Sequence, residues 1–378
     1  MEDSLEIVIN GRFLSQRATG VQRVAREVTT ALDRLLEDGA FPGVRARLVA
    51  QPKADRESMP LRRIAVEEAR GGTGHFWEQW TLPRHVRGGR LLCLGNSAPV
   101  LSLASGRPVA VMLHDQAHLL FPGDYSPMYR VFHRLIEALI LRAARPLLLV
   151  SESERAALAR RHPRAAARAI VAPNGSWTGD AAPGSQIANV GRRYGLFVGR
   201  PSDRKNIDGV LAVAIGLAQE RGSTFRIVGP GAEALADRIP ARVRHLVTLH
   251  GSVTDAELPS LYAGAAYLLY PSFYEASGLP PSEAMRFGCP VVTSDLPVMR
   301  ERCEGAALFT DPADPVAIRA QVLAILDDPV CAAELARKGR ARVQALTWRR
   351  QSELIVTAML AAESSLRPGV SGGPALAA

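Results

Sequence analysis

Cysteine is scarce in this sequence, and its spacing argues against a zinc site. The chain of 378 residues contains four cysteines, Cys93, Cys289, Cys303 and Cys331, and none of them forms a Cys-x-x-Cys pair. A structural zinc site needs thiolates or imidazoles at short, regular spacings. We therefore predict buried, reduced thiols in place of metal ligands.

Long hydrophobic runs are also missing. Runs such as Val109–Leu113 and Ala265–Tyr270 are far shorter than the ~20 apolar residues that a membrane-spanning helix needs. The first residues, Met1–Glu6, are acidic and lack the basic segment and apolar core of a secretory signal. These absences predict a cytoplasmic protein without a membrane span.

Lysine is rare, so the basic charge is almost entirely arginine. The formal net charge is +9, with 25 Lys and Arg against 18 Asp and Glu in residues 1–185 and 21 against 19 in residues 186–378. A basic N-terminal half can attract the cytoplasmic face of an inner membrane or a phosphate-bearing acceptor, although a merely solvated surface is the simplest explanation. Nucleic acid ranks last, because no helix-turn-helix, zinc-finger or aromatic RNA-binding pattern accompanies the charge.

Short apolar runs alternate with longer amphipathic runs, which predicts an α/β protein with parallel sheets wrapped by helices. The chain is longer than the roughly 250–300 residues that one core supports, and a small, polar stretch over 176–189 separates two such series. We therefore expect two doubly wound, Rossmann-like domains with a cleft between them. The expected parts are an N-terminal domain over 1–185, a C-terminal domain over 190–347, a helix over 348–364 that packs back on the N-terminal domain, and a disordered tail over 366–378.

The strongest motif is a Gly/Pro loop that opens a helix between two glutamates. Glu275 precedes the loop, and Glu283 follows eight positions later, within the predicted helix. A helix N-terminus presents free backbone N–H groups and a positive dipole end, which suits an anion such as phosphate. A carboxylate on each side can bind hydroxyl groups that flank the phosphate. From spacing alone, a capped helix with two surface glutamates is an equally good explanation.

This run resembles the E-x7-E signature of GT-B-fold retaining glycosyltransferases of family four. The resemblance continues through Gly288-Cys289-Pro290-Val291-Val292 and implies that Glu283 holds the donor ribose and Glu275 a hydroxyl of the transferred sugar. It also implies that the backbone amides of Ser277, Gly278 and Leu279 face the sugar and the diphosphate. Ser277 stands where the family often has Phe, and Ala276 where it often has Gly, which bears on sugar preference.

A second motif, Gly199-Arg200-Pro201-Ser202-Asp203-Arg204-Lys205-Asn206, follows a predicted strand. A basic pair across a tight turn can neutralise a diphosphate, with the guanidinium as a fork and the ammonium as a point charge. Alone, this loop is more readily explained as a solvated surface loop. It resembles the family's Gly-Arg…Lys-Asn motif, in which Arg200 and Lys205 clamp the pyrophosphate.

Weaker signals lie at other predicted strand ends. By the same resemblance, Gly229 lets the nucleotide approach the backbone, Val253 meets the nucleobase through its main chain, and Gly20 lets the donor phosphate pass. His114 and Asp115 close a strand at the edge where α/β ligand sites lie, and the family's His-Asp pair faces the sugar and the acceptor. A lone histidine there is otherwise more often structural.

An aromatic cluster precedes these strand ends in the N-terminal half. Trp77, Glu78 and Trp80 lie close together in the sequence. They can line an acceptor pocket, but plain packing explains them equally well.

The resemblance implies a retaining glycosyltransferase that moves a hexose from a nucleotide-sugar to a lipid-linked or polysaccharide acceptor in exopolysaccharide or lipopolysaccharide biosynthesis. Mannose from GDP-mannose is the leading donor, with UDP-sugars close behind. No cofactor or metal is expected, because Arg200 and Lys205 take the role of a divalent ion. Glu275 is either a nucleophile or, more simply, a hydroxyl ligand, and His114 orients the sugar or assists proton movement. The alternatives are a non-catalytic GT-B scaffold that binds nucleotide-sugar or partner proteins, and a GT-B sugar epimerase.

Overall fold

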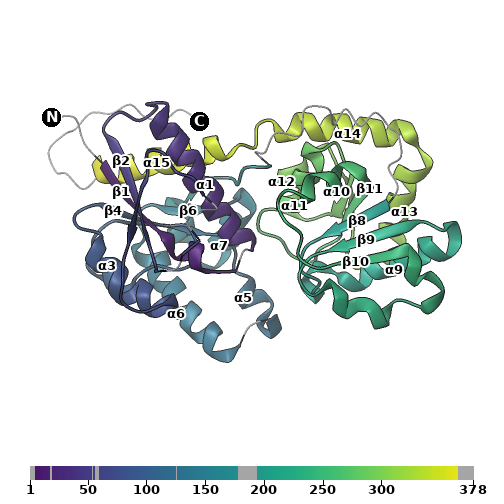
Figure 1. Ribbon diagram of the computed structural model, residues 1–378, viewed down its shortest axis with the longest axis horizontal. Helices are drawn as coiled ribbons and strands as arrows, with labels where there is room; N and C mark the ends of the chain where they lie inside the picture. The colour runs from purple at the N-terminus through teal and green to yellow at the C-terminus, as the bar shows by residue number, and fades with distance from the viewer. Residues whose placement is uncertain are drawn as a thin grey trace. The chain divides into compact units, whose positions relative to one another are not determined.

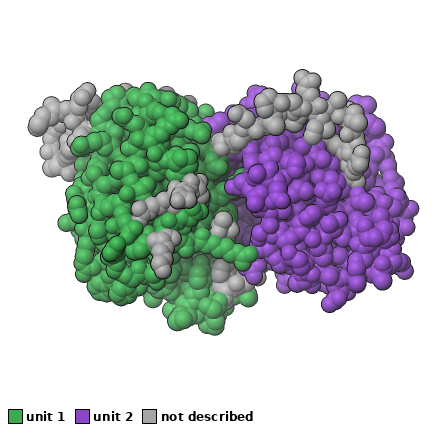
Figure 2. Space-filling model, in the orientation of Figure 1, with its two compact units in different colours: residues 1–173, 348–378 green, residues 174–347 purple. Residues whose placement is uncertain are grey.

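The computed structural model describes residues 5–17, 19–52, 54–55, 59–124, 126–177 and 194–364. The chain divides into two compact units (Figure 2). Unit 1 comprises Met1–Pro173 and Trp348–Ala378, and unit 2 comprises Asn174–Thr347. Most of the expected linker, from residue 178 on, and the expected tail over 366–378 lie outside the described residues.

The first boundary between the units falls earlier in the chain than residue 185. The segment after Pro173 packs within unit 2, where Ser176 N donates to Leu346 O at 2.8 Å and its Oγ donates to Ser282 O at 3.0 Å. Trp177 packs against the core of unit 2. These contacts assign the segment to unit 2, although its composition is that of a linker.

Unit 1 is built on one parallel sheet with the strand order β3-β2-β1-β4-β5-β6-β7 (Figure 1). Its strands are β1 Leu5–Asn10, β2 Val44–Ala50, β3 Ala65–Glu68, β4 Arg90–Cys93, β5 Val109–Leu113, β6 Leu147–Leu149 and β7 Ile170–Val171. Its helices are α1 Gly20–Glu37, α2 Gly74–Phe76, α3 Leu82–His85, α4 Val100–Ala104, α5 Ala117–Leu120, α6 Pro127–Ala143, α7 Glu152–Arg161, α8 Pro163–Arg168 and α15 Trp348–Ser364. Helix α15 packs along α1 (Figure 1), so the last helix of the chain completes the first unit.

The local sequence explains several helices of unit 1. Ser151 accepts a hydrogen bond from Glu154 N at 3.1 Å and so begins α7. In α1 the buried side chains include Val24, Val28 and Leu32, which recur at helical spacing. Helix α6 was not among the predicted elements, because its exposed face also carries apolar side chains and the period is blurred.

Unit 2 repeats the same architecture with the strand order β10-β9-β8-β11-β12-β13. Its strands are β8 Tyr194–Val198, β9 Thr224–Val228, β10 Val247–His250, β11 Ala265–Tyr270, β12 Val291–Ser294 and β13 Leu308–Thr310. Its helices are α9 Ile207–Arg221, α10 Leu258–Gly264, α11 Leu279–Arg286, α12 Pro297–Cys303, α13 Pro315–Asp327 and α14 Pro329–Val343. All of its strand pairs are parallel, so the loops after the strands gather at one edge.

The cysteines match the prediction of buried thiols. Cys93, Cys289 and Cys303 are buried, Cys331 is half-buried, and none of the four forms a disulfide. Burial raises the pKa of Cys303 to about 12, so its thiol stays protonated at neutral pH. Within the described ranges, no helix combines the length and apolar character that crossing a membrane would require.

Candidate functional site

The predicted site residues of unit 2 follow the strands at the centre of its sheet. Strand β8 lies between β9 and β11, so successive crossovers depart in opposite directions from this point. Ligands of doubly wound sheets bind at such a switch point, at the carboxyl ends of the strands. Arg200 and Lys205 follow β8, Gly229 follows β9, and Glu275 follows β11.

Lys205 and Glu275 form the central ion pair of this edge. Lys205 Nζ donates to Glu275 Oε1 and to the hydroxyl of Tyr270. Both Lys205 and Glu275 are largely buried, and Arg204 Nη1 lies 4.0 Å from Glu275 Oε1. Burial opposes ionisation of Glu275, but Lys205 and Arg204 outweigh it and hold the pKa of Glu275 below its ordinary value. The pair is therefore a carboxylate and an ammonium at neutral pH.

Tyr270 lies beside the central ion pair, where its hydroxyl accepts a hydrogen bond from Lys205 Nζ. Burial, followed by the charge of Glu275 and more weakly that of Glu283, raises the pKa of Tyr270 well above its ordinary value. The Tyr270 hydroxyl is therefore neutral.

Glu283 is buried on α11 and is held by a tyrosine from the preceding helix. Tyr262 Oη, on α10, donates to Glu283 Oε2 at 2.8 Å. The Tyr262 ring stacks on Phe287 with 8° between the planes. The hydrogen bond from Tyr262 fixes the direction of the Glu283 carboxylate, and the sequence did not predict this bond. The signal that could have found it is Tyr262 in the short helix that follows the predicted base-binding loop.

The loop before α11 is shaped by Gly278. Its φ is +66°, a left-handed conformation that favours glycine. A Cβ there would also press against the side chain of Met299 on α12. Ser277 Oγ accepts a hydrogen bond from Asn174 Nδ2 at 2.8 Å, so the serine found where the family often has Phe takes part in holding the loop. Leu279 begins the helix.

Arg302 on α12 is a second residue that sequence reasoning missed. Its guanidinium donates to the backbone carbonyls of Asn174 and Gly175 and, at 2.8 Å, to Ser282 Oγ on α11. Burial lowers the pKa of Arg302 to about 10, which leaves it charged at neutral pH. Through Asn174, this buried cation braces the loop that carries Ser277. No local pattern marks it, because its partners lie far away in the sequence.

Two glycines let the ends of β8 and β9 approach each other. Gly199 N donates to Val228 O at 2.8 Å. Gly229 has a φ of +150°, and a Cβ at that position would collide with the carbonyl of Gly199. The need for glycine at 229 therefore comes from the protein backbone itself, whether or not a nucleotide lies nearby. Arg200 is exposed beside them, and Val253 is half-buried against the core of unit 2.

The other two predicted site residues belong to unit 1. Gly20 is the first residue of α1 and is exposed, where the free N–H groups of the helix begin. His114 is buried after β5, and its Nε2 donates to Leu94 O at 2.8 Å. Burial lowers the pKa of His114, although that carbonyl and Asp115 oppose the shift. His114 is thus a neutral imidazole with the lone pair on Nδ1.

Trp77 packs in the core and does not line a pocket. It is fully buried in unit 1, and its Nε1 donates to Ala69 O at 2.8 Å. Glu78 is also buried and accepts hydrogen bonds from Asn10 and Ser97. Only Trp80 of this cluster is exposed. The packing alternative is therefore correct for Trp77.

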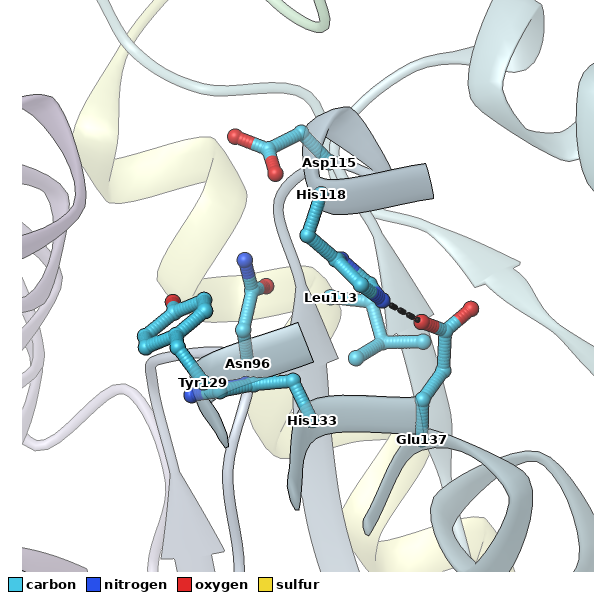
Figure 3. A pocket seen from close by; sticks show the side chains of 7 residues that line it. All are labelled: Asn96, Leu113, Asp115, His118, Tyr129, His133 and Glu137. Carbon is cyan, nitrogen blue, oxygen red and sulfur yellow. Dashed lines mark ion pairs between the residues drawn. The ribbon is translucent and has the colours of Figure 1, made fainter. Parts of the chain in front are cut away.

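A small pocket does open in unit 1, at the carboxyl ends of β4 and β5 (Figure 3). Its lining side chains come from the loop after β4, the end of β5, α5 and α6, and they are Asn96, Leu113, Asp115, His118, Tyr129, His133 and Glu137. Among the lining residues only Asp115 had been singled out from the sequence. His118 follows His114 by four positions, and His133 and Glu137 are four positions apart on α6, which is the signal that could have found them.

Known proteins resemble both the donor loops and the whole fold. Residues 192–328 match the family described as glycosyl transferases group 1. All the predicted donor residues of unit 2 fall within this matched region. O-antigen chain mannosyltransferase B of Escherichia coli is 34% identical over 161 residues, which is 41% of this chain and 42% of that protein. The match therefore spans less than half of that relative's length.

Solved structures extend the likeness beyond the matched region. Sucrose-phosphate synthase of Thermosynechococcus elongatus superposes with a TM-score of 0.73 at 19% identity, over 96% of this chain and 100% of that chain. HepE of Anabaena, solved with UDP and glucose, gives a TM-score of 0.67 at 18% identity, over 95% and 100% of the two chains. The chain has the GT-B fold, which confirms the predicted fold class.

Proposed function

We propose that the chain is a retaining glycosyltransferase that uses a nucleotide-sugar and needs no metal. The observation that carries the proposal is the ion pair of Lys205 and Glu275 beside the start of α11, within the matched region. Glu283, fixed by Tyr262, supplies the second carboxylate. These groups provide charge for a diphosphate and acceptors for the hydroxyls of a sugar and a ribose.

In the proposed reaction, the bond between the anomeric carbon and the diphosphate oxygen breaks, the acceptor oxygen bonds to that carbon on the same face, and its hydroxyl proton passes to the departing diphosphate oxygen. Negative charge grows on the leaving diphosphate, so groups that bind it more strongly in the transition state accelerate the reaction. Arg200, Lys205 and the backbone amides of Ser277, Gly278 and Leu279 would take this role; the next two residues of α11, Pro280 and Pro281, have no N–H to donate. Glu275 would hold a sugar hydroxyl, because its carboxylate stays ionised against Lys205.

For the substrates we propose mannose from GDP-mannose and a lipid-linked or polysaccharide acceptor of cell-surface polysaccharide assembly. The support is the name of the E. coli relative, an O-antigen chain mannosyltransferase. HepE, solved with UDP and glucose, keeps UDP-sugars as the second donor class. Both classes share the diphosphate that Lys205 and Arg200 would bind.

Peripheral contact with the cytoplasmic face of a membrane is part of the same proposal. Met128, Val131 and Leu135 are exposed on one stripe of α6, and Arg134 is exposed on the same helix. Apolar side chains beside a cation suit an anionic lipid surface. Sedimentation with vesicles containing anionic lipid tests this, and binding that is unchanged in Leu135→Glu would contradict it.

Calorimetric titration with GDP, UDP and ADP, first without metal and then with magnesium, tests the donor site. We expect one nucleotide to bind independently of magnesium and to lose at least about tenfold in affinity in Glu283→Gln, since a charged hydrogen bond contributes roughly 1.5–3 kcal/mol. The matched control is Glu334→Gln, at an exposed glutamate of α14. A folded protein that binds none of the three nucleotides would instead favour a non-catalytic scaffold.

A further inference from the structure

Arg204 is a charged residue of the unit 2 site to which the proposed function gives no role. It lies in the turn Asp203–Lys205 that precedes α9, and its side chain is 23% exposed. Its Nη1 lies 4.0 Å from Glu275 Oε1. The carboxylate that would hold a sugar hydroxyl therefore has two cations beside it, Lys205 and Arg204.

Arg204 is fastened at two points to the segment that leads into Glu275. Its backbone carbonyl accepts a hydrogen bond from Phe273 N at 2.9 Å, and its Nη1 donates to Tyr274 O at 3.3 Å. Both partners are backbone atoms, so these contacts do not depend on the rotamer of another side chain. They also do not involve Lys205. The guanidinium is thus held beside Glu275 independently of the ammonium.

The ammonium of Lys205 has to serve more than one anion once a donor is bound. An ammonium carries three N–H donors, and Lys205 Nζ already donates to Glu275 Oε1 and to the hydroxyl of Tyr270. A diphosphate that Lys205 binds must therefore share this ammonium with Glu275. The contact between Lys205 and the carboxylate weakens at the step in which Glu275 has to hold the sugar.

A nucleotide-sugar also brings negative charge close to a buried carboxylate. The Glu275 side chain is 8% exposed, and a like charge nearby favours the protonated form of a buried carboxyl group. A protonated Glu275 would bind a sugar hydroxyl less strongly, because hydrogen bonds to an ionised acceptor are roughly twice as strong as neutral ones. An opposite charge within about 4–6 Å favours the ionised form, and Arg204 lies at that distance.

The other ionisable groups around Glu275 do not replace Arg204. Burial raises the pKa of Glu275, and Lys205, followed by Arg204, lowers it to below its ordinary value. Tyr270, from β11, is neutral, and the charge of Glu283, from α11, acts on Tyr270. When Lys205 is shared with a diphosphate, Arg204 is the cation that stays with Glu275.

We propose that Arg204 is a positioning residue for Glu275, whose guanidinium keeps that carboxylate ionised and in place while Lys205 binds the donor diphosphate. This inference rests on the proposed function, for which it supplies the counter-ion of the sugar-binding carboxylate. It divides the three cations by task, with Arg200 and Lys205 for the diphosphate and Arg204 for Glu275. If Arg204 only fastened the backbone, its charge would be dispensable.

The test measures how much the sugar adds to donor affinity as the pH changes, with the full chain. The probes are two pairs, GDP-mannose with GDP and UDP-glucose with UDP, titrated calorimetrically from about pH 8 to about pH 5. Within a pair, the ratio of the two affinities reports the contacts of the sugar, and the contact with Glu275 is one of them. In the wild type we expect this ratio to stay constant over the range, because Glu275 stays ionised.

Arg204→Gln keeps an N–H donor for Tyr274 O but removes the charge. Its affinity ratio should match the wild type near pH 8 and fall at least about threefold toward pH 5, because losing an opposite charge raises the pKa of a carboxyl group by roughly 1–3 units. Arg204→Lys restores the charge and should restore the wild-type profile. The matched control is Arg221→Gln, which removes an exposed arginine that pairs with Asp327 and should leave the ratio unchanged at every pH.

The outcomes separate this inference from the proposed function. A loss in Arg204→Gln that is equal at every pH, or that Arg204→Lys does not repair, would show a purely structural role and overturn the inference. Weaker binding of GDP or UDP with an unchanged ratio would also overturn it, because Arg204 would then bind the diphosphate itself. If a nucleotide binds and the ratio in Arg204→Gln does not depend on pH, the inference fails and the donor site stands. If the folded wild type binds none of the four probes, the proposed function fails and the inference falls with it.

Discussion

The two units of this protein have the same architecture but prepare their sites differently. In unit 2 the key side chains are tied to one another: Lys205 to Glu275, Tyr262 to Glu283, and Arg302 to the backbone of Asn174. In unit 1 the pocket keeps His133 Nε2 without a partner among the described residues. A site whose groups are internally paired is held rigid before a ligand arrives, which favours catalysis.

The largest expected effect breaks the charged centre of unit 2. Lys205→Ala should lower kcat by about 100-fold or more, because one lost donor to a developing anion costs roughly 10²–10³ in rate. It also leaves the buried carboxylate of Glu275 without its ammonium, so we expect the pKa of Glu275 to rise. Initial rates of sugar transfer check this. Lys338→Ala, at an exposed lysine on α14, is the control. An equal loss of kcat in both variants would show that Lys205 has no specific role in catalysis.

The next effect concerns the rigidity of the donor loop. Arg302→Ala should lower the free energy of unfolding by about 3 kcal/mol, because two backbone carbonyls and Ser282 lose a buried, charged donor. Urea unfolding, followed by tryptophan fluorescence, measures the change. Arg300→Ala removes a neighbouring arginine that pairs with Asp295 at the surface and should stay within about 0.5 kcal/mol of the wild type. Similar losses in the two variants would mean that the brace contributes little.

A smaller effect tests the positioning of Glu283. Tyr262→Phe removes one hydroxyl and keeps the ring on Phe287, so we expect nucleotide affinity to fall about tenfold while the protein stays folded. Titration with the nucleotide that binds the wild type gives the dissociation constant. Tyr267→Phe, at another buried tyrosine of unit 2, is the control and should bind normally. An unchanged dissociation constant in Tyr262→Phe would show that Glu283 needs no such support.

The smallest effect sharpens the contrast between the units through pH. The folded pKa of His133 is about 4, below the ordinary 6.5, so the unfolded chain binds more protons between these values. Stability should therefore fall as pH drops from about 6.5 to 4, by roughly 1 kcal/mol once solvent screening is allowed for. His133→Phe removes this dependence, and urea midpoints at pH 7 and pH 5 measure it. His162→Phe, the control, should keep the wild-type difference between the urea midpoints at pH 7 and pH 5. If His133→Phe kept the same difference, the pH dependence would not come from His133.

Glu275 changes stability in the same direction but at lower pH, and it provides the comparison. Its folded pKa is depressed, so its contribution to stability is present above the unfolded value near 4.5 and is lost as pH falls below it. Between pH 7 and pH 5 the ion pair of unit 2 should therefore be constant while the histidine cluster of unit 1 changes. The two sites are separable by pH for this reason.

The sequence by itself determined the fold class and the contiguous part of the donor loops. Alternating apolar runs specify parallel strands because buried strands and amphipathic helices have different periods. The loop and helix from Glu275 to Glu283 could be predicted because they are consecutive in the chain. The structure also shows why glycine is needed at two positions: a Cβ at 229 would collide with the carbonyl of Gly199, and a Cβ at 278 would press against the side chain of Met299.

Only the tertiary structure decided which distant side chains meet. Helix α6 was not predicted, because its exposed face also carries apolar side chains. The pocket residues on this helix, Tyr129, His133 and Glu137, were missed for the same reason. Arg302 meets Asn174 across 128 positions, and no local periodicity encodes such a contact. Local sequence patterns report the conformational preference of one helical turn or one strand. A pocket is formed by several loops, distant in the sequence, that a parallel sheet brings together at one edge.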